Sequence, residues 1–179
     1  MISEAVHVHA ESEVLHRPVR ILFVFAWLVV GGEETEVRLL ARNLDPSKYT
    51  IEVVACFRKD NMPDQTHRQL EELGVPVDRT PYTLSFEDTV VYLARKVASY
   101  DLVVACQAVK DIYPALELLE KRPPLIEHGG LVYEATVGPK YFTSRYVGVC
   151  ASIRDAAASV MPERGHHALE IPSMVDLTE

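Results

Sequence analysis

Residues 20–44 decide the fold, and they read RILFVFAWLVVGGEETEVRLLARNL. The unbroken apolar run at 21–30 is typical of a buried strand. The segment 33–44 begins with acidic residues and has the apolar spacing of a helix. Gly31 and Gly32 form the turn between them. Because a backbone without side chains can be approached closely and a helix N-terminus attracts anions, this turn predicts a site for a phosphorylated small molecule.

The rest of the chain repeats this alternation of apolar runs with segments of helical period. Such alternation is typical of βαβ units and a mainly parallel sheet. We expect a three-layer α/β/α, Rossmann-like sandwich whose sheet has about seven strands. The further expected strands lie at 51–57, 75–77, 101–106, 124–128, 146–151 and 168–171.

Local signals mark two helix starts and one long connection. Ser85 with Asp88 forms a capping box, and Ser152 with Asp155 forms a second one. Residues 131–145 are richer in aromatic and polar side chains than the other connections, and we expect an irregular loop there. Loops of that length in compact domains often carry function.

Composition bounds the class of protein. The chain has 179 residues, of which 48% are hydrophobic, and a formal net charge of −8. This length predicts one domain, at 19–179, with residues 1–18 as an acidic leader whose histidines belong to a loose tail rather than a metal site. The longest apolar run is about half of the roughly 20 residues that a membrane-spanning helix needs, so we expect a cytoplasmic protein.

Charge and cysteine spacing exclude several functions. An acidic chain without a basic stripe argues against nucleic acid as a partner. The three cysteines have no paired short spacing, so we expect neither disulfides nor a metal site, and we interpret all three as core residues. They are Cys56, Cys106 and Cys150.

Other known site motifs are missing. Thr35 stands where a dinucleotide-binding turn needs its third glycine, and no acidic residue ends the second strand. The sequence also has no Walker-type phosphate loop and no Gly-x-Ser-x-Gly elbow.

A second glycine pair follows the fifth expected strand, which ends in Glu127 and His128 before Gly129 and Gly130. Parallel strands end at the same edge of a sheet, so these residues and the first glycine turn can share one cleft. An imidazole there could orient a hydroxyl or interact with a developing charge, or it could simply be held by backbone at the strand end. The adjacent glycines favour the functional interpretation.

The order of these motifs resembles the N-terminal domain of a retaining GT-B glycosyltransferase of family four (group 1). Residues 21–33 are similar to the first strand and Gly-Gly-x-Glu loop of that family, and residues 102–106, the strand end 127–129 and residues 147–152 follow in the order that the family shows. Residues 171–176, IPSMVD, are similar to the segment that introduces the second domain, although Ser173 and Met174 replace Asn-Gly. The resemblance covers 19–179, and it implies that a donor-binding C-terminal domain follows in the complete protein.

The resemblance implies sugar transfer from a nucleotide-activated donor with retention, this chain being the acceptor-side half and inactive alone. Gly31 and Gly32 would approach the donor phosphates, and His128 would be the catalytic residue beside the donor sugar. No metal and no tightly bound cofactor are implied; the nucleotide sugar is a co-substrate, and the acceptor is a glycan, a lipid or a small molecule. Further acceptor or sugar contacts would come from Glu127, Gly129, Gly130, Tyr133, Tyr141 and Ser152.

Other hypotheses stay open on the sequence. The chain could be a free-standing Rossmann-like binding or regulatory module, or half of a GT-B-related sugar-nucleotide epimerase. Contact with a membrane surface would rest on Arg95 and Lys96 of one amphipathic helix, which an ordinary solvated face explains equally well.

Overall fold

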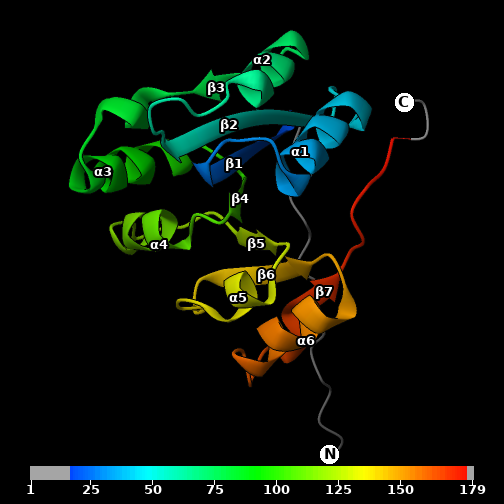
Figure 1. The fold of residues 1–179 in the computed structure, drawn as a ribbon. Coiled ribbons are helices and arrows are strands. Elements are labelled where there is room, and N and C mark those ends of the chain that lie inside the picture. Colours follow the sequence, from blue (N-terminus) through cyan, green and yellow to red (C-terminus); the bar gives the residue numbers. More distant parts are fainter. Residues whose placement is uncertain (1–16, 177–179) are drawn as a thin grey trace, which may run out of the picture.

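The computed structural model describes residues 17–176, and they build one seven-stranded sheet (Figure 1). All neighbouring strands are parallel, in the order β3-β2-β1-β4-β5-β6-β7. This confirms the predicted α/β fold, with a sheet that is parallel throughout. The expected leader, apart from its last two residues, lies outside the described residues, as do His7, His9 and His16.

The strands and helices follow one another as the sequence pattern predicts. The strands are β1 (Val19–Trp27), β2 (Tyr49–Phe57), β3 (Val77–Asp78), β4 (Leu102–Cys106), β5 (Leu125–Gly129), β6 (Thr143–Gly148) and β7 (Ala168–Glu170). The helices are α1 (Gly32–Asn43), α2 (Gln65–Glu72), α3 (Phe86–Val97), α4 (Val109–Glu117), α5 (Val132–Thr136) and α6 (Ala151–Ser159), with short 3₁₀ turns η1 (Thr80–Thr83) and η2 (Gly165–His167).

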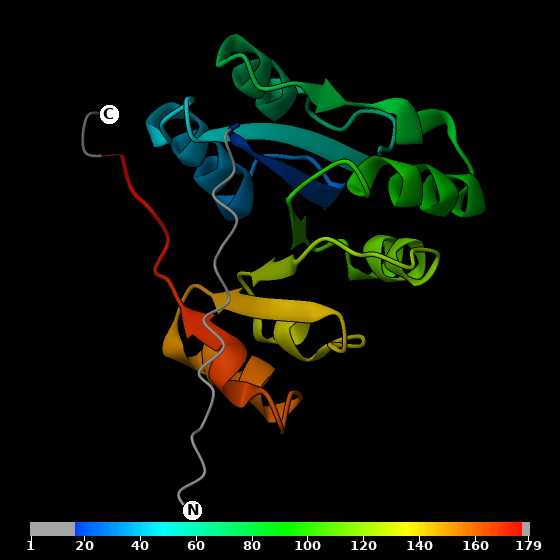
Figure 2. The ribbon, with the colours of Figure 1, turned by 180° about the vertical axis from the view of Figure 1, so that it is seen from behind.

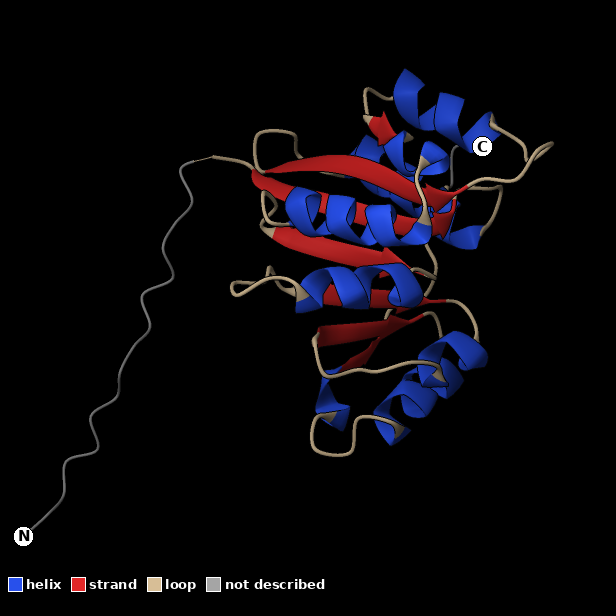
Figure 3. Ribbon diagram, turned by 90° about the vertical axis from the view of Figure 1, so that its left-hand side faces the viewer, coloured by secondary structure: helices blue, strands red, loops and turns tan. Residues whose placement is uncertain are grey.

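The helices cover the sheet on both faces, as Figure 3 shows. Successive residues of a strand point to opposite faces, so β1 supplies both cores. Leu22 and Val24 pack with α3 and α4, whereas Phe23 and Phe25 pack with α1 and α2. A third cluster, around Tyr146, joins α5 and α6 to β6 and β7. These elements lie at one end of the sheet (Figure 2).

The order in which strands are added to the sheet reverses between β1 and β4, because β2 and β3 lie on one side of β1 and β4 to β7 lie on the other. Helices α1 and α2 lead outward from β1 to β3, and α3 then returns the chain to β4 on the other side of β1. In open parallel sheets, ligands bind at such a switch point, beside the carboxyl ends of the strands. The topology therefore directs attention to the ends of β1, β4 and β5.

Three local predictions are wrong. Cys150 is exposed and does not belong to the core, unlike Cys56 and Cys106. Residues 131–145 are not irregular throughout, because they contain α5 and the start of β6; the Glu134 carboxylate caps α5 by accepting the N–H groups of Gly130 and Leu131 at 3.0 and 3.1 Å. The second capping box is also absent, since Cys150 is the N-cap of α6 and Ser152 lies inside its first turn. Ser85 does cap α3, accepting the Asp88 N–H at 3.0 Å.

Residues 171–176, which follow β7, run along the outside of the domain toward α1 (Figures 1 and 2). Asp176 pairs there with Arg42 at 2.6 Å. Residues 171–176 are thereby tied to the helix that follows the first strand. Among residues 17–176, no helix combines the length and the apolar character that crossing a bilayer requires.

Candidate functional site

A cavity of about 840 Å³ lies at the carboxyl edge of the central strands. Trp27 at the end of β1, Gln107 after β4 and His128 on β5 contribute to its lining, together with side chains from α4 and α5. Its volume lies in the range of small-molecule sites, and its position matches the switch point of the sheet.

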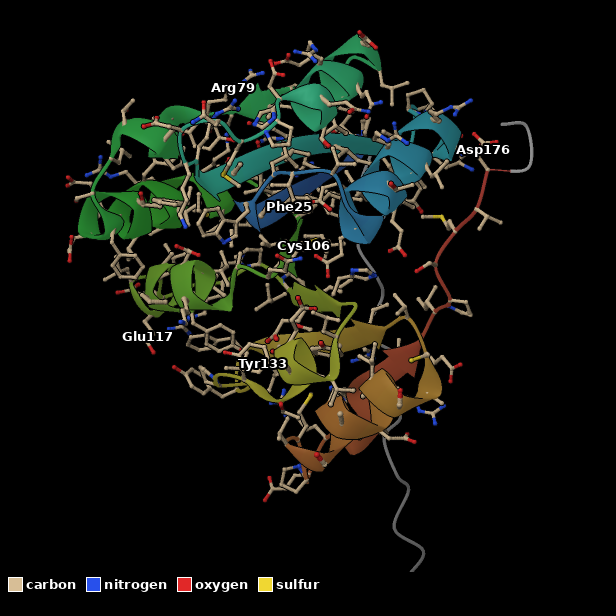
Figure 4. The ribbon with its side chains drawn as sticks, viewed as in Figure 1. Phe25, Arg79, Cys106, Glu117, Tyr133 and Asp176 are labelled. Atoms are coloured by element: carbon tan, nitrogen blue, oxygen red, sulfur yellow. The ribbon has the colours of Figure 1, made fainter. Side chains whose placement is uncertain are left out.

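Aromatic rings dominate the outer part of this cavity. Trp27 and Phe57 meet edge to face with their ring centroids 4.5 Å apart, and the Lys59 ammonium lies 5.0 Å from the Trp27 ring centroid. Tyr133 and Tyr141 line the opposite side, and both side chains are more than half exposed (Figure 4 labels Tyr133). Exposed rings beside polar groups suit a ligand that has both an apolar face and hydroxyl groups.

Glu127, which lines the floor of the cavity, forms a buried ion pair with Lys140, which is not part of the lining. Lys140 Nζ lies 2.6 Å from Glu127 Oε2, and both side chains are only 3% exposed. Glu127 Oε1 accepts hydrogen bonds from the Tyr113 hydroxyl, at 3.0 Å, and from the Thr143 hydroxyl. Both oxygens of Glu127 are therefore engaged within the protein, which makes the floor rigid.

His128 sits between two carboxylates from the N-terminal part of α1, those of Glu33 and Glu36. Its Nε2 lies 2.8 Å from Glu36 Oε2, and its Nδ1 lies 3.6 Å from Glu33 Oε1. Burial alone lowers the pKa of His128, but these two carboxylates outweigh it and raise the pKa to about 9. Without another ligand, the imidazole is a cation at neutral pH at the edge of the cavity.

The side chain that lies closest to Gly31 in the first glycine turn is the carboxylate of Glu34. Glu34 is buried, its Oε1 accepts the Val29 N–H at 3.2 Å, and burial raises its pKa. A Cβ on Gly31 would lie 2.5 Å from Glu34 Oε2, whereas a Cβ on Gly32 would meet no atom within 4 Å. Gly31 lines a separate small hollow, so the role of this turn in donor-phosphate binding stays a prediction.

The second glycine pair serves packing and capping. A Cβ on Gly129 would lie 2.1 Å from the Tyr146 hydroxyl oxygen, so only glycine fits without movement of that buried ring. The N–H of Gly130 is engaged by Glu134. Ser152 is on α6, where its hydroxyl lies 3.1 Å from Cys150 Sγ.

The structure brings some of the predicted site residues together and leaves others apart. The cavity lining includes four of them: Glu127, His128, Tyr133 and Tyr141. The others are not part of that lining: Gly31, Gly32, Gly129, Gly130 and Ser152.

Sequence reasoning missed the charged partners of this site. The spacing of Glu33 and Glu36 on one helix face was a usable signal for His128, since residues three apart are neighbours on a helix. Lys140 carried no such signal, because it lies in a connection far from Glu127 in sequence. Among the described residues, one group brings three metal-binding donor atoms within 4.8 Å of one another: Glu33, Cys106 and His128.

No protein-family model matches the sequence, and no curated protein matches it. Solved structures do match the fold. The apo form of a lipopolysaccharide outer core galactosyltransferase, WaaB, superimposes with a TM-score of 0.65 and 13% sequence identity, over 89% of this chain and 47% of that protein. At this identity the match shows the fold, which is that of one half of a GT-B chain.

Two further structures give the same result. A protein assigned as a UDP-N-acetylglucosamine 2-epimerase from Listeria monocytogenes matches with a TM-score of 0.52 and 11% identity, over 79% of this chain and 42% of that one. A hypothetical protein from Streptococcus mutans matches with a TM-score of 0.52 and 14% identity, over 86% and 55% of the two chains. The chain thus spans about half the length of these three structures.

Proposed function

We propose that the chain is the acceptor-side half of a cytoplasmic retaining glycosyltransferase of family four (group 1), which uses a nucleotide-activated sugar. The observation that carries the proposal is the aromatic cavity at the switch point of the sheet, in a fold shared with half of a galactosyltransferase. The other half of the protein would supply most donor contacts, so the isolated chain would not transfer sugar.

In this proposal, the cavity holds the acceptor and His128 faces the donor. Tyr133 and Tyr141 would contact the acceptor, and the paired Glu127 and Lys140 would keep the floor fixed beneath it. His128 lies at the cavity edge, where a positive charge favours the departing diphosphate. Positioning of the two substrates then supplies much of the rate enhancement, without a strong base.

The test uses the protein extended to the natural end of its reading frame. Calorimetric titration with a panel of nucleotide sugars should find one donor, and product analysis should find a glycoside with retained configuration. His128→Ala should lower kcat by about 10²-fold, as loss of a charge-stabilising group does. The exposed His166 gives the control, because His166→Ala should leave kcat unchanged.

Two results would refute parts of the proposal. If the extended protein binds no nucleotide sugar, or if the reading frame stops after residue 179, the chain is a free-standing binding module instead. If His128→Ala and His166→Ala have equal turnover, His128 has no part in the reaction.

The match to a UDP-N-acetylglucosamine 2-epimerase favours one alternative, half of a sugar-nucleotide epimerase. A glycosyltransferase and an epimerase of this kind would share the fold and would both need a second domain. The product distinguishes them, because an epimerase returns a nucleotide sugar of altered configuration and forms no glycoside.

A further inference from the structure

The Glu33 carboxylate is buried without a partner for its charge at hydrogen-bonding distance. Its residue is 7% exposed, and neither of its oxygens has a hydrogen-bond partner in the described part of the chain. The imidazole of His128 approaches Oε1 only to 3.6 Å, which is longer than a hydrogen bond. Burying a carboxylate without hydrogen bonds is costly even beside the charged imidazole, and a cation in direct contact with its oxygens would offset that cost.

The ring of His128 is held so that one nitrogen faces this carboxylate. Glu36 Oε2 engages Nε2 at 2.8 Å, which leaves Nδ1 directed at Glu33. A carboxylate that fixes the far nitrogen of a histidine is the usual second layer of a metal site, because it sets the tautomer and the ring orientation.

A third donor atom comes from the neighbouring strand. Cys106 on β4 is the register partner of His128 on β5, and its side chain is buried. Its sulfur, a Glu33 oxygen and a His128 nitrogen all lie within 4.8 Å of one another. Bonds of about 2.0–2.3 Å in a tetrahedral zinc site place ligand atoms about 3.4 Å apart, so small side-chain shifts would complete the site.

We propose that Glu33, Cys106 and His128 bind one divalent metal ion of the zinc class. Thiolate, imidazole and carboxylate together suit zinc, and cobalt can replace it, whereas magnesium and calcium prefer oxygen ligands alone. Three protein ligands leave a fourth position for water or for an oxygen of a bound ligand.

The charge of the surroundings supports a cation at this place. The side chains of Glu33, Glu34, Glu36 and Glu134 place negative charge around the Cys106 sulfur. A metal ion would replace the thiol proton and the proton on Nδ1 of His128, and it would offset part of the negative charge of the glutamates. With the metal bound, the positive charge beside a donor diphosphate would come from the ion and not from the His128 imidazole; this consequence alone rests on the proposed function.

The test measures metal directly and needs no nucleotide sugar. The protein is stripped with a chelator and dialysed against Zn²⁺, and bound zinc is then counted by mass spectrometry and its Kd measured by competition with a chromophoric chelator. We expect one zinc per chain, about 10²-fold weaker binding in Cys106→Ser, and 10- to 100-fold weaker binding in Glu36→Gln. Co²⁺ should give a thiolate charge-transfer band that Cys106→Ser lacks.

Two control variants separate this site from other ligands. Cys56→Ser removes a buried thiol from β2, which β1 separates from β4, and should leave zinc binding unchanged. A double variant of the adjacent His166 and His167 should also bind zinc as the wild type does. If circular dichroism shows that Cys106→Ser does not fold, the cobalt spectrum of the wild type tests whether a thiolate binds the metal. Absence of that band, equal zinc affinity in folded Cys106→Ser, or loss of zinc in the histidine double variant would overturn the proposal.

Discussion

Lys140→Met removes the positive charge that pairs with Glu127 in the floor of the cavity. The methionine keeps most of the volume of the lysine stem, so the change acts mainly on charge. Glu127 keeps its hydrogen bonds from Tyr113 and Thr143, but its Oε2 loses the ammonium at 2.6 Å. Because both partners are 3% exposed, water cannot replace that ammonium.

The expected cost follows from this burial. Breaking a buried ion pair by removing one partner typically costs about 3–5 kcal/mol, because the other charge is left uncompensated. For a chain of this length, each kcal/mol lowers Tm by about 2–4 °C, so Lys140→Met should lower Tm by about 10 °C. Adding Glu127→Gln should recover part of the loss, giving a coupling energy of about 2 kcal/mol.

Urea unfolding at pH 7, followed by circular dichroism, measures these free energies. The control is Lys48→Met, which removes an exposed lysine 3.7 Å from Asp45 and should cost less than about 0.5 kcal/mol. Equal costs for Lys140→Met and Lys48→Met would refute the reasoning. So would a double variant whose cost is the sum of the two single costs.

Three further predictions concern the scaffold. Gly148→Ala places a Cβ 2.9 Å from the backbone nitrogen of Arg154 in α6, so it should lower the free energy of unfolding by about 1–3 kcal/mol. Gly130→Ala is the control, because its Cβ would meet no atom within 4 Å and the change should be near neutral. The urea midpoints of the two variants measure the difference. Ser85→Ala removes the N-cap of α3 and should cost about 1 kcal/mol in the same assay, a loss that Ser85→Asn should largely restore. Burial alone raises the pKa of Asp78, but hydrogen bonds led by that from Lys96 lower it to about 2. The stability that Asp78 contributes is therefore present above about pH 4 and lost as the pH falls toward 2, so Asp78→Asn should flatten the pH dependence of unfolding there.

The element order was predictable because strand and helix periods are local properties of the sequence. The alternation at 21–44 and its repeats specify parallel strands joined by helices, and the Ser85 cap needs only residues three apart. The prediction failed where another residue took the role that the local sequence pattern had indicated, or where a side chain ordered a segment that has no pattern. Ser152 had the spacing of a cap, but the N-cap of α6 is Cys150, two residues earlier. Glu134 ordered a helix in a stretch without periodicity by taking up two backbone N–H groups.

By itself, the sequence determined the fold class, the glycine turns and the position of His128 at a strand end. The tertiary structure decided which side chains meet there. Glu33 and Glu36 reach His128 because the order β1-β4-β5 brings the start of α1 and the end of β5 to the same edge of the sheet, and Lys140 reaches Glu127 from the connection between α5 and β6. Such pairings join residues far apart in the chain, so no short spacing encodes them. The charges around the cavity therefore depend on how the strands are ordered, which is a property of the whole sheet.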